Sequence, residues 1–375
     1  MKRIFDGDKV IEAEHINGYL MDGPDAWVES RTKPICDVPV MMSGGKPVEG
    51  GFLIFSEEEK VEFLQKDASA EIYFRPFVGA EDFINGRVRW CLWLFGVSPA
   101  ELRKHPLIME RVEKVRDFRA SSVKAATREA SFRPSLFMEI KQPSTDYILV
   151  PATSSEKRAY IPIGFLGKDV IASNAASFIP SATLYHFGVL TSSVHMAWMR
   201  TVCGRLEMRY RYSANIVYNN FPWLDVEEFS RVEGESVENV LDRINKIDRI
   251  GDDENPDNPV NPVKKTLHVS TRSTRLKNTS APLRLCVKNN SVCSVSSVVK
   301  NITQTAQSIL DARALYPDSS LADLYDPLTM PIELRKAHAA NDAAVMKAYG
   351  YSPSMTEPEI VADLMKRYQK KVADS

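Results

Sequence analysis

The sequence predicts an α+β fold, in which a mixed or antiparallel sheet domain with helices precedes a small all-helical domain. Up to about residue 224, short segments rich in β-branched and aromatic residues alternate with segments of helical spacing. After residue 301 only helical periodicity remains. A chain of 375 residues with 44% hydrophobic and 26% charged residues can bury a core and form two or three domains.

The predicted elements of the first domain follow a lead-in over residues 1–19. Strand composition, bounded by turn residues, occurs at 51–55, 71–78, 87–95, 146–152, 160–166 and 177–190. Helical spacing covers 99–130, where Pro99 lies near the start. A second helix is predicted over 191–209, starting at Thr191, Ser192 and Ser193.

Residues 225–300 lose clean periodicity and form the predicted boundary between the two domains. From Asn258 to Leu310 there is no acidic residue, but there are eight basic ones. Such composition buries too little apolar surface to offset the entropy of ordering, which predicts a flexible basic linker or insertion. Amphipathic helices are then predicted at 304–316, 331–350 and 357–374, within a helical domain over 301–375.

Composition excludes several classes of protein. The formal net charge is −1, so any nucleic-acid site must be a local patch. The five cysteines form no CxxC pair, which argues against a disulfide framework or a zinc site. No signal peptide is evident, and the longest apolar run, 90–97, is too short for a bilayer. We therefore expect a cytoplasmic protein without membrane contact.

The sequence lacks the motifs that a DNA-amine methyltransferase needs. Such an enzyme has a Gly-rich turn for S-adenosylmethionine and an Asn/Asp-Pro-Pro-aromatic loop for the flipped base. No Pro-Pro dipeptide occurs, and the nearest sequence, 219–223, has the wrong residues before Pro222. The glycines of 43–51 lack the Lys-Ser/Thr of a P-loop, which favours tight turns over a phosphate site. We predict no catalytic, cofactor-binding or metal-binding residues.

Arginine and tyrosine are densest between residues 198 and 223. Glu207, Arg209 and Arg211 are spaced two apart, so an extended backbone would direct them to one side. Arginine binds guanine O6 and N7, and glutamate accepts from cytosine N4, so a Glu–Arg pair can address one C·G base pair. The alternative is an exposed ion pair worth at most ~1 kcal/mol. The residues alone leave both interpretations open.

Other basic side chains could contact phosphates, which position a protein on DNA without specifying sequence. They are equally compatible with ordinary exposed charges. The candidates are Arg116, Arg119, Lys124 and Arg128 in the predicted helix, and Lys157 and Arg158 in a polar loop.

Segment 204–223, GRLEMRYRYSANIVYNNFPW, resembles the end of the target-recognition domain of MmeI-like, type IIL restriction–modification enzymes. Further segments resemble the same family: 27–60, 74–94, 158–173, 184–206 and 309–350. The resemblance implies a DNA target-recognition domain over 20–224 and the family's C-terminal domain over 301–375. Family members methylate adenine N6 in double-stranded DNA with S-adenosylmethionine. Their methyltransferase and nuclease domains would precede residue 1, so we expect a chain that lacks them.

The resemblance also implies roles for particular residues. Glu207 and Arg209 match positions that jointly read the base pair beside the methylated adenine, and the acidic–Arg pair suggests a cytosine whose guanine partner contacts Arg209. Ala175 and Arg211 match positions implicated in the preceding base pair. The predicted DNA-binding set also contains Arg205, Tyr210 and Asn174.

Three hypotheses follow for the function. The leading one is a DNA-recognition module without catalysis of its own. The second is one subunit of a split enzyme, active only with a separate methyltransferase chain, and the third is a non-functional gene fragment. Segment 225–300 departs from the family, whose members connect the two domains through a shorter stretch. Whether the C-terminal helices dock on the first domain therefore stays open.

Overall fold

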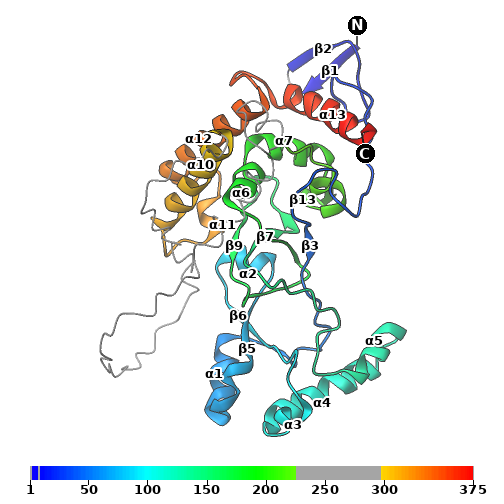
Figure 1. Ribbon diagram of the computed structural model, residues 1–375, viewed down its shortest axis with the longest axis vertical. Coiled ribbons are helices and arrows are strands. Elements are labelled where there is room, and N and C mark those ends of the chain that lie inside the picture. The colour runs from blue at the N-terminus through cyan, green and yellow to red at the C-terminus, as the bar shows by residue number, and fades with distance from the viewer. Residues whose placement is uncertain (1, 7–8, 225–296, 375) are drawn as a thin grey trace.

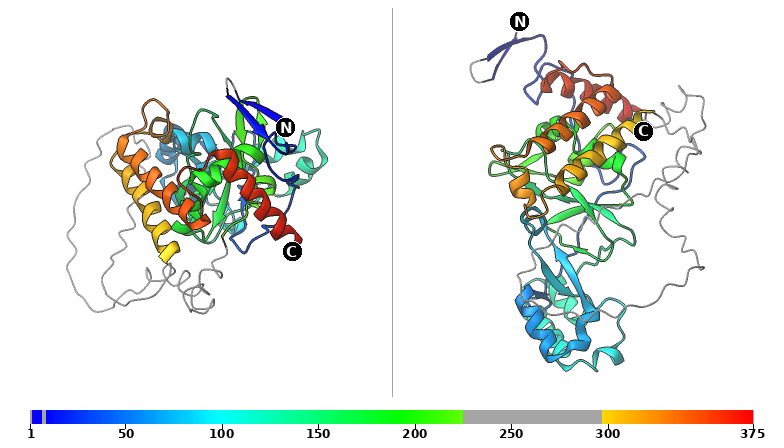
Figure 2. Two further views of the ribbon diagram at one scale, coloured as in Figure 1. Left: turned by 90° about the horizontal axis from the view of Figure 1, so that it is seen from above. Right: turned by 90° about the vertical axis from the view of Figure 1, so that its left-hand side faces the viewer.

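The computed structural model of the protein describes residues 2–6, 9–224 and 297–374. The molecule is elongated, with a lower lobe around α1 and α4 and an upper lobe around α6, α7, α10 and α12 (Figure 1). The side view shows the same two lobes (Figure 2). The predicted linker, 225–300, lies outside the described residues except for 297–300. A mixed sheet domain followed by helices confirms the predicted fold class.

The lead-in begins with a hairpin. Strands β1 (Lys2–Asp6) and β2 (Lys9–Ala13) pair antiparallel, with Ile4 opposite Ile11. Beyond it, the Asp22 carboxylate accepts hydrogen bonds from the backbone N–H groups of Glu14 and His15.

The lower lobe contains a four-stranded sheet in the order β10-β5-β6-β4. Its strands are β4 (Ile54–Phe55), β5 (Phe74–Val78), β6 (Arg89–Leu92) and β10 (Ile171–Ala172). Only the β10–β5 pairing is parallel. The surrounding helices are α1 (Glu57–Lys66), η1 (Ala68–Tyr73), α3 (Pro99–Leu102), α4 (Pro106–Ala120), α5 (Ala125–Glu129) and η2 (Ala130–Phe132). Helix α2 (Ala80–Asn85) follows β5 and lies where the two lobes meet (Figure 1). Edge-to-face packing of Phe55, Phe63 and Phe74 fills the core of this lobe.

The upper lobe contains two antiparallel sheets, in the orders β3-β11-β7-β9 and β12-β13-β8. The first consists of β3 (Met42–Ser43), β7 (Tyr147–Pro151), β9 (Gly164–Leu166) and β11 (Ala176–Pro180). The second consists of β8 (Thr153–Ser154), β12 (Gly204–Leu206) and β13 (Arg209–Arg211). Every residue of β7 is buried, so this strand forms the centre of the lobe.

Helices cover the upper sheets. They are α6 (Leu184–Leu190), α7 (Ser193–Val202), η3 (Ala214–Tyr218), α10 (Ser297–Ala314), α11 (Leu321–Leu324), α12 (Ile332–Tyr349) and α13 (Glu357–Ala373). No helix within the described residues is both long enough and apolar enough to cross a bilayer.

The C-terminal helices dock on the first domain, which answers the question that the sequence left open. Helix α10 packs on α6 at Gly188, and the Asn341 side chain donates to the Gly188 carbonyl oxygen at 2.8 Å. The Asp342 carboxylate accepts from the Ser193 N–H and from the Tyr160 hydroxyl, both at 2.6 Å. Burial raises the pKa of Asp342, and these donors oppose that rise because they stabilise the charged form. One hydrophobic core therefore spans both regions.

Three predicted elements end differently in the structure. Segment 177–190 is not one strand, because it turns at Ser181 (φ 54°) after β11 and continues as α6. The predicted helix over 191–209 ends at Val202, since Cys203 is extended and the chain enters the β12–β13 hairpin. The predicted helix over 99–130 is three helices, and Pro106 starts the longest of them at its first turn.

The prediction of Arg119 as an exposed or phosphate-binding charge is wrong. Its side chain is fully buried, and its five N–H donors all bind backbone carbonyl oxygens. The acceptors belong to Pro47, Val48, Ala130, Arg133 and Leu136. Arg119 therefore ties α4 to two loops.

We predict that Gly188→Val will destabilise the contact between the two domains. A Cβ at Gly188 would lie 2.7 Å from Ile302 Cγ2 and 3.1 Å from Ala306 Cβ, so one helix must move. Overpacking of this kind costs about 1–3 kcal/mol, which urea unfolding would measure. The matched control is Gly204→Val, because a Cβ there meets nothing within 4 Å. Equal stability of the two variants would contradict the assigned packing.

Candidate nucleic-acid interface

The β12–β13 hairpin presents the predicted DNA-reading residues. Leu206 pairs with Arg209 across a two-residue turn at Glu207 and Met208. Arg209 and Arg211 are exposed, whereas Tyr210 between them is buried. The backbone is extended over Arg209–Arg211, which meets the condition for side chains two residues apart to share one side, and the two arginines face outward together.

Tyr210 and Arg205, which were also predicted to bind DNA, have a different environment. The Tyr210 side chain faces the protein, and the Arg205 guanidinium lies over its ring, 4.1 Å from the centroid. Arg205 also donates to the Met208 carbonyl oxygen at 3.3 Å. These contacts brace the hairpin from the side opposite to Arg209 and Arg211.

Glu207 has a backbone conformation that glutamate rarely adopts. Its φ is 56°, in the left-handed region, which costs a non-glycine residue roughly 1–2 kcal/mol. Its carboxylate accepts from Arg209 Nη2 at 2.8 Å, although 78% of the side chain is exposed. An exposed pair contributes at most ~1 kcal/mol, so it does not offset the strain. Stability alone therefore does not account for a glutamate at this turn.

The loop that carries Asn174 and Ala175 is fixed through its backbone. The N–H of Ser173 donates to the Val78 carbonyl oxygen at 2.8 Å, and the N–H of Asn174 donates to that of Gly45 at 2.9 Å. The Ser173 hydroxyl accepts from the Ala175 N–H at 3.3 Å. Both Asn174 and Ala175 are exposed, so their side chains are free to meet a partner while the backbone stays in place.

Backbone hydrogen bonds connect this loop to the hairpin. The N–H of Ala152 donates to the Ala175 carbonyl oxygen at 3.4 Å, and the N–H of Tyr212 donates to that of Ala152 at 3.0 Å. Arg211 pairs with Thr153, directly after Ala152. The structure therefore brings the loop and the hairpin to the same end of the upper lobe.

The glycine-rich segment after β3 is a packing element. A Cβ on Gly44 would overlap the carbonyl oxygen of Ser173, so only glycine permits this close approach. The N–H groups of Gly44 and Gly45 donate to the carbonyl oxygens of Ala176 and Ala172. Since these donors are already used, they cannot hold a phosphate, which agrees with the absence of a P-loop in the sequence.

The base of the hairpin is anchored by a buried polar pair. His195 Nε2 and the Tyr212 hydroxyl lie 2.8 Å apart, and both side chains are buried. Burial lowers the pKa of His195 to about 3, so the ring is neutral at pH 7. This contact ties the residue after β13 to helix α7.

The segment that superficially resembles a methyltransferase loop is also structural. Phe221 and Trp223 are buried, and Asn220 Nδ2 donates to the carbonyl oxygens of Glu29, Asn215 and Ile216. Asn219 and Asn220 are both buried, so a flipped base could not reach the amide oxygen of either residue. Across 2–6, 9–224 and 297–374, no group of three metal-ligating side chains is found.

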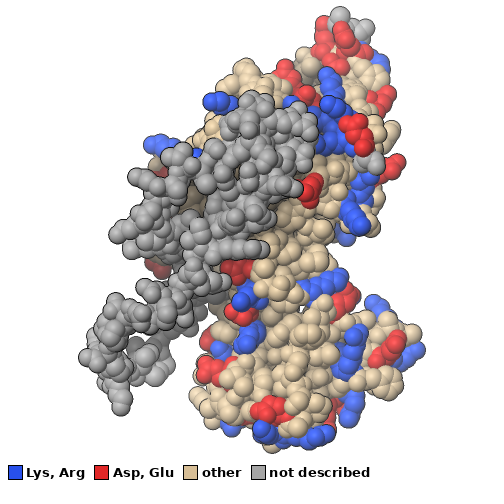
Figure 3. Space-filling model, viewed as in Figure 1, with Lys and Arg blue, Asp and Glu red and all other residues tan. Residues whose placement is uncertain are grey.

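Charge on the surface is mixed. On the face drawn in Figure 3, basic and acidic side chains alternate over both lobes. This pattern agrees with the formal net charge of −1.

Sequence reasoning missed one further charged group beside the loop. Arg89 lines the same hollow as Asn174 and Ala175, and the Asp82 carboxylate holds its guanidinium. In the sequence Arg89 lies within a strand-like segment, and no local pattern distinguishes it from the other basic residues.

These features are those of a target-recognition module attached to a helical domain. Residues 22–225 match the family described as "MmeI, target recognition domain", and residues 296–374 match "MmeI, C-terminal domain". The chain belongs to the MmeI family, which confirms the family predicted from its sequence.

Two relatives show the extent of the likeness. "DNA methyltransferase A" of Bacillus subtilis (strain 168) is 32% identical over 356 residues, which are 95% of this chain and 33% of the relative. A solved structure of the type IIL restriction-modification enzyme MmeI in complex with DNA is 39% identical, with a TM-score of 0.75. That match covers 97% of this chain and 40% of the other. This chain thus spans about a third to two fifths of these relatives.

We predict that Glu207→Gly will leave the free energy of unfolding unchanged or raise it by about 1 kcal/mol. Glycine adopts a positive φ without the steric cost that glutamate has, while the exposed ion pair that is lost contributes little. Denaturant unfolding would measure the change. In contrast, Glu113→Gly on the exposed face of α4 should cost roughly 0.5–1 kcal/mol. Equal losses in both variants would contradict the assigned strain.

We predict that His195 makes the protein sensitive to acid. Folding lowers the pKa of His195 from 6.5 to about 3. The folded state therefore has its full stability with respect to this group above pH 6.5, and it loses stability as the pH falls from there toward 3. His195→Gln should remove up to about 1.4 kcal/mol per pH unit from the slope of stability over that range. Urea unfolding between pH 7.5 and 5 would measure it. His338→Gln should act similarly, since burial also lowers the pKa of His338 to about 3. Unchanged slopes in both variants would refute the prediction.

Proposed function

We propose that this chain reads the base sequence of double-stranded DNA for an adenine-N6 methyltransferase activity. Residues outside this chain would bind S-adenosylmethionine and would form the catalytic loop. The observation that supports the proposal best is the turn at Glu207, where a strained backbone places a carboxylate against Arg209. Strain of this kind is concentrated at functional sites in proteins.

The chemistry of the pair fits one base pair. The Arg209 fork can donate to O6 and N7 of guanine, while the Glu207 carboxylate can accept from N4 of cytosine. Arg211 is exposed on the same side of β13, and Ala175 and Asn174 lie at the same end of the lobe. We assign these three residues to the neighbouring base pair. Arg205 and Tyr210 support the hairpin from its other side.

Relatives provide independent support. One is named a DNA methyltransferase, and the solved MmeI structure holds DNA. Because neutralised phosphates release counterions, binding by this chain should weaken as salt rises.

We predict that the charge exchange Glu207→Lys with Arg209→Asp will change the preferred base pair at one position of the DNA site. The donor and acceptor exchange places, so the preference for the original pair should fall by roughly 5-fold to 150-fold, equivalent to ~1–3 kcal/mol. Selection from a randomised duplex pool by the purified chain would measure it.

The matched control exchanges another exposed ion pair of opposite charges, through Glu62→Lys with Lys66→Asp on α1. This control should leave base preference unchanged. If the pair at the hairpin also leaves it unchanged, the assigned readout is wrong.

A further inference from the structure

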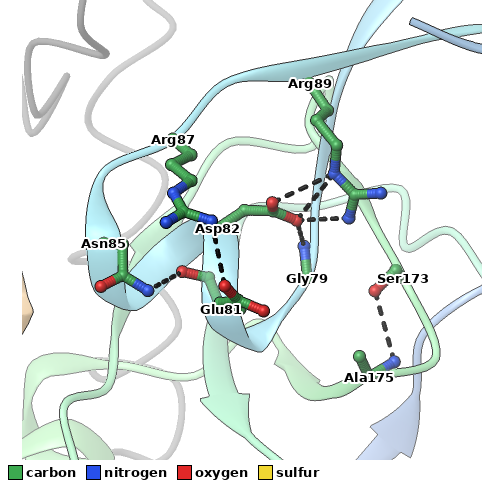
Figure 4. Close-up of polar contacts among 8 residues, drawn as sticks. All are labelled: Gly79, Glu81, Asp82, Asn85, Arg87, Arg89, Ser173 and Ala175. Atoms are coloured by element: carbon green, nitrogen blue, oxygen red, sulfur yellow. Dashed lines mark hydrogen bonds and ion pairs between the residues drawn. The ribbon is translucent and has the colours of Figure 1, made fainter. Parts of the chain in front are cut away.

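Asp82 and Arg89 form a rigid pair beside the loop of Asn174 and Ala175 (Figure 4). The Asp82 carboxylate accepts from Arg89 Nε at 3.0 and 3.1 Å and from Nη2 at 2.5 Å. It also accepts from the N–H of Gly79 at 2.8 Å, which fixes the start of α2. The Asp82 side chain is only 10% exposed, whereas that of Arg89 is 42% exposed. A buried acceptor thus holds a guanidinium at the surface.

Three side chains converge at Gly79. A Cβ there would lie 2.9 Å from Ser173 Oγ, 3.1 Å from Asp82 Oδ2 and 3.4 Å from Arg89 Nη2. Arg89 therefore lies next to Ser173, where the loop of Asn174 and Ala175 begins. The guanidinium also lies over the Phe77 ring, 5.1 Å from its centroid, which restrains it further.

The contacts with Asp82 leave one edge of the guanidinium available. Arginine has five N–H donors in a planar fork, and Asp82 uses the edge formed by Nε and Nη2. Within the described residues, Nη1 has no hydrogen-bond partner, and in Figure 4 one terminal nitrogen points away from the carboxylate. The remaining edge, between Nη1 and Nη2, has two parallel donors that match the paired acceptors of guanine.

We propose that Arg89 is a further base-reading residue, which contacts O6 and N7 of a guanine, and that Asp82 positions it. The inference rests on the proposed DNA-reading function. It adds a base pair to those assigned to the hairpin and the loop. Arg89 lines the same hollow as Asn174 and Ala175, so the three side chains would meet adjacent parts of one DNA site.

A guanine edge fits this hollow better than a phosphate. Glu49 and Glu59 also line the hollow, and these acidic groups repel a phosphate. Both carboxylates already accept from backbone N–H groups: Glu49 from Gly51 and Leu53, and Glu59 from Ser56. They are therefore held in place, so the hollow keeps its acidic side when DNA approaches.

The test compares Arg89→Gln with Arg87→Gln in the full 375-residue chain. Arg87 is a matched control, because it lies two residues away and forms a more exposed ion pair with Glu81 at 3.0 Å. It does not line the hollow. Duplexes selected from a randomised pool by the wild-type chain would be altered at each base pair in turn, and their relative affinities measured at several salt concentrations.

We expect Arg89→Gln to lose a guanine preference at one base pair by roughly 5-fold to 150-fold, and Arg87→Gln to lose none. Asp82→Asn should reduce the preference at the same base pair, as a positioning residue would. Arg89→Gln leaves the buried Asp82 carboxylate without its partner and could fold poorly for that reason. The double variant Asp82→Asn with Arg89→Gln removes this carboxylate and should show the same loss of guanine preference.

Two outcomes would overturn the assignment. The first is that Arg89→Gln has the same base preference as Arg87→Gln. The second is a uniform loss over all sequences with a shallower salt dependence, which indicates a phosphate contact. Both leave the hairpin readout untouched, since Glu207 and Arg209 would still set their own base pair. A wild-type chain without any sequence preference would instead refute the proposed function.

Discussion

The close backbone approach at Gly44 is the constraint on which the candidate interface depends. Strand β10 belongs to the lower sheet and β11 to the upper one, so residues 173–175 form the crossing between them. The Gly44–Gly45 segment follows β3 and binds both sides of this crossing through backbone hydrogen bonds. A side chain at Gly44 would separate the two. Main-chain contacts thus fix the position of the loop of Asn174 and Ala175, whatever side chains this loop has.

The residues that stabilise the fold around the candidate interface are different from the residues that face outward from it. The supporting groups are buried: Tyr210 and Tyr212 below the hairpin, His195 on α7, and Asn220 among backbone carbonyls. The outward side chains, Glu207, Arg209, Arg211, Asn174 and Ala175, are exposed and make few contacts that hold the fold. Substitutions at exposed positions cost little stability when they break no cap or strained turn. Under the proposed function, substitutions at these exposed positions would change the preferred base without loss of the fold.

Local patterns in the sequence predicted much of this architecture. The α+β class and the helical C-terminal region follow from periodicity and composition. The helix limits were less predictable, because tertiary pairing ends them: residues 204–206 have to pair with β13, so α7 stops at Val202. Docking of the last helices depends on Asn341 and Asp342, whose partners in the first domain are more than 140 residues away in the chain. No window of sequence contains such information.

The arginines show most clearly why the remainder could not be predicted. Arg119 is buried with all five donors bound to carbonyl oxygens, Arg89 is held by one carboxylate, and Arg209 pairs with its neighbour at an exposed turn. The three differ in burial and in the number of acceptors that the fold places around them. An arginine with every donor used can only stabilise the fold, whereas one with a free edge can bind a base. Since the net charge of −1 gives the chain no general attraction for DNA, the proposed recognition would depend on individual side chains, among them arginines whose donors the fold leaves unused.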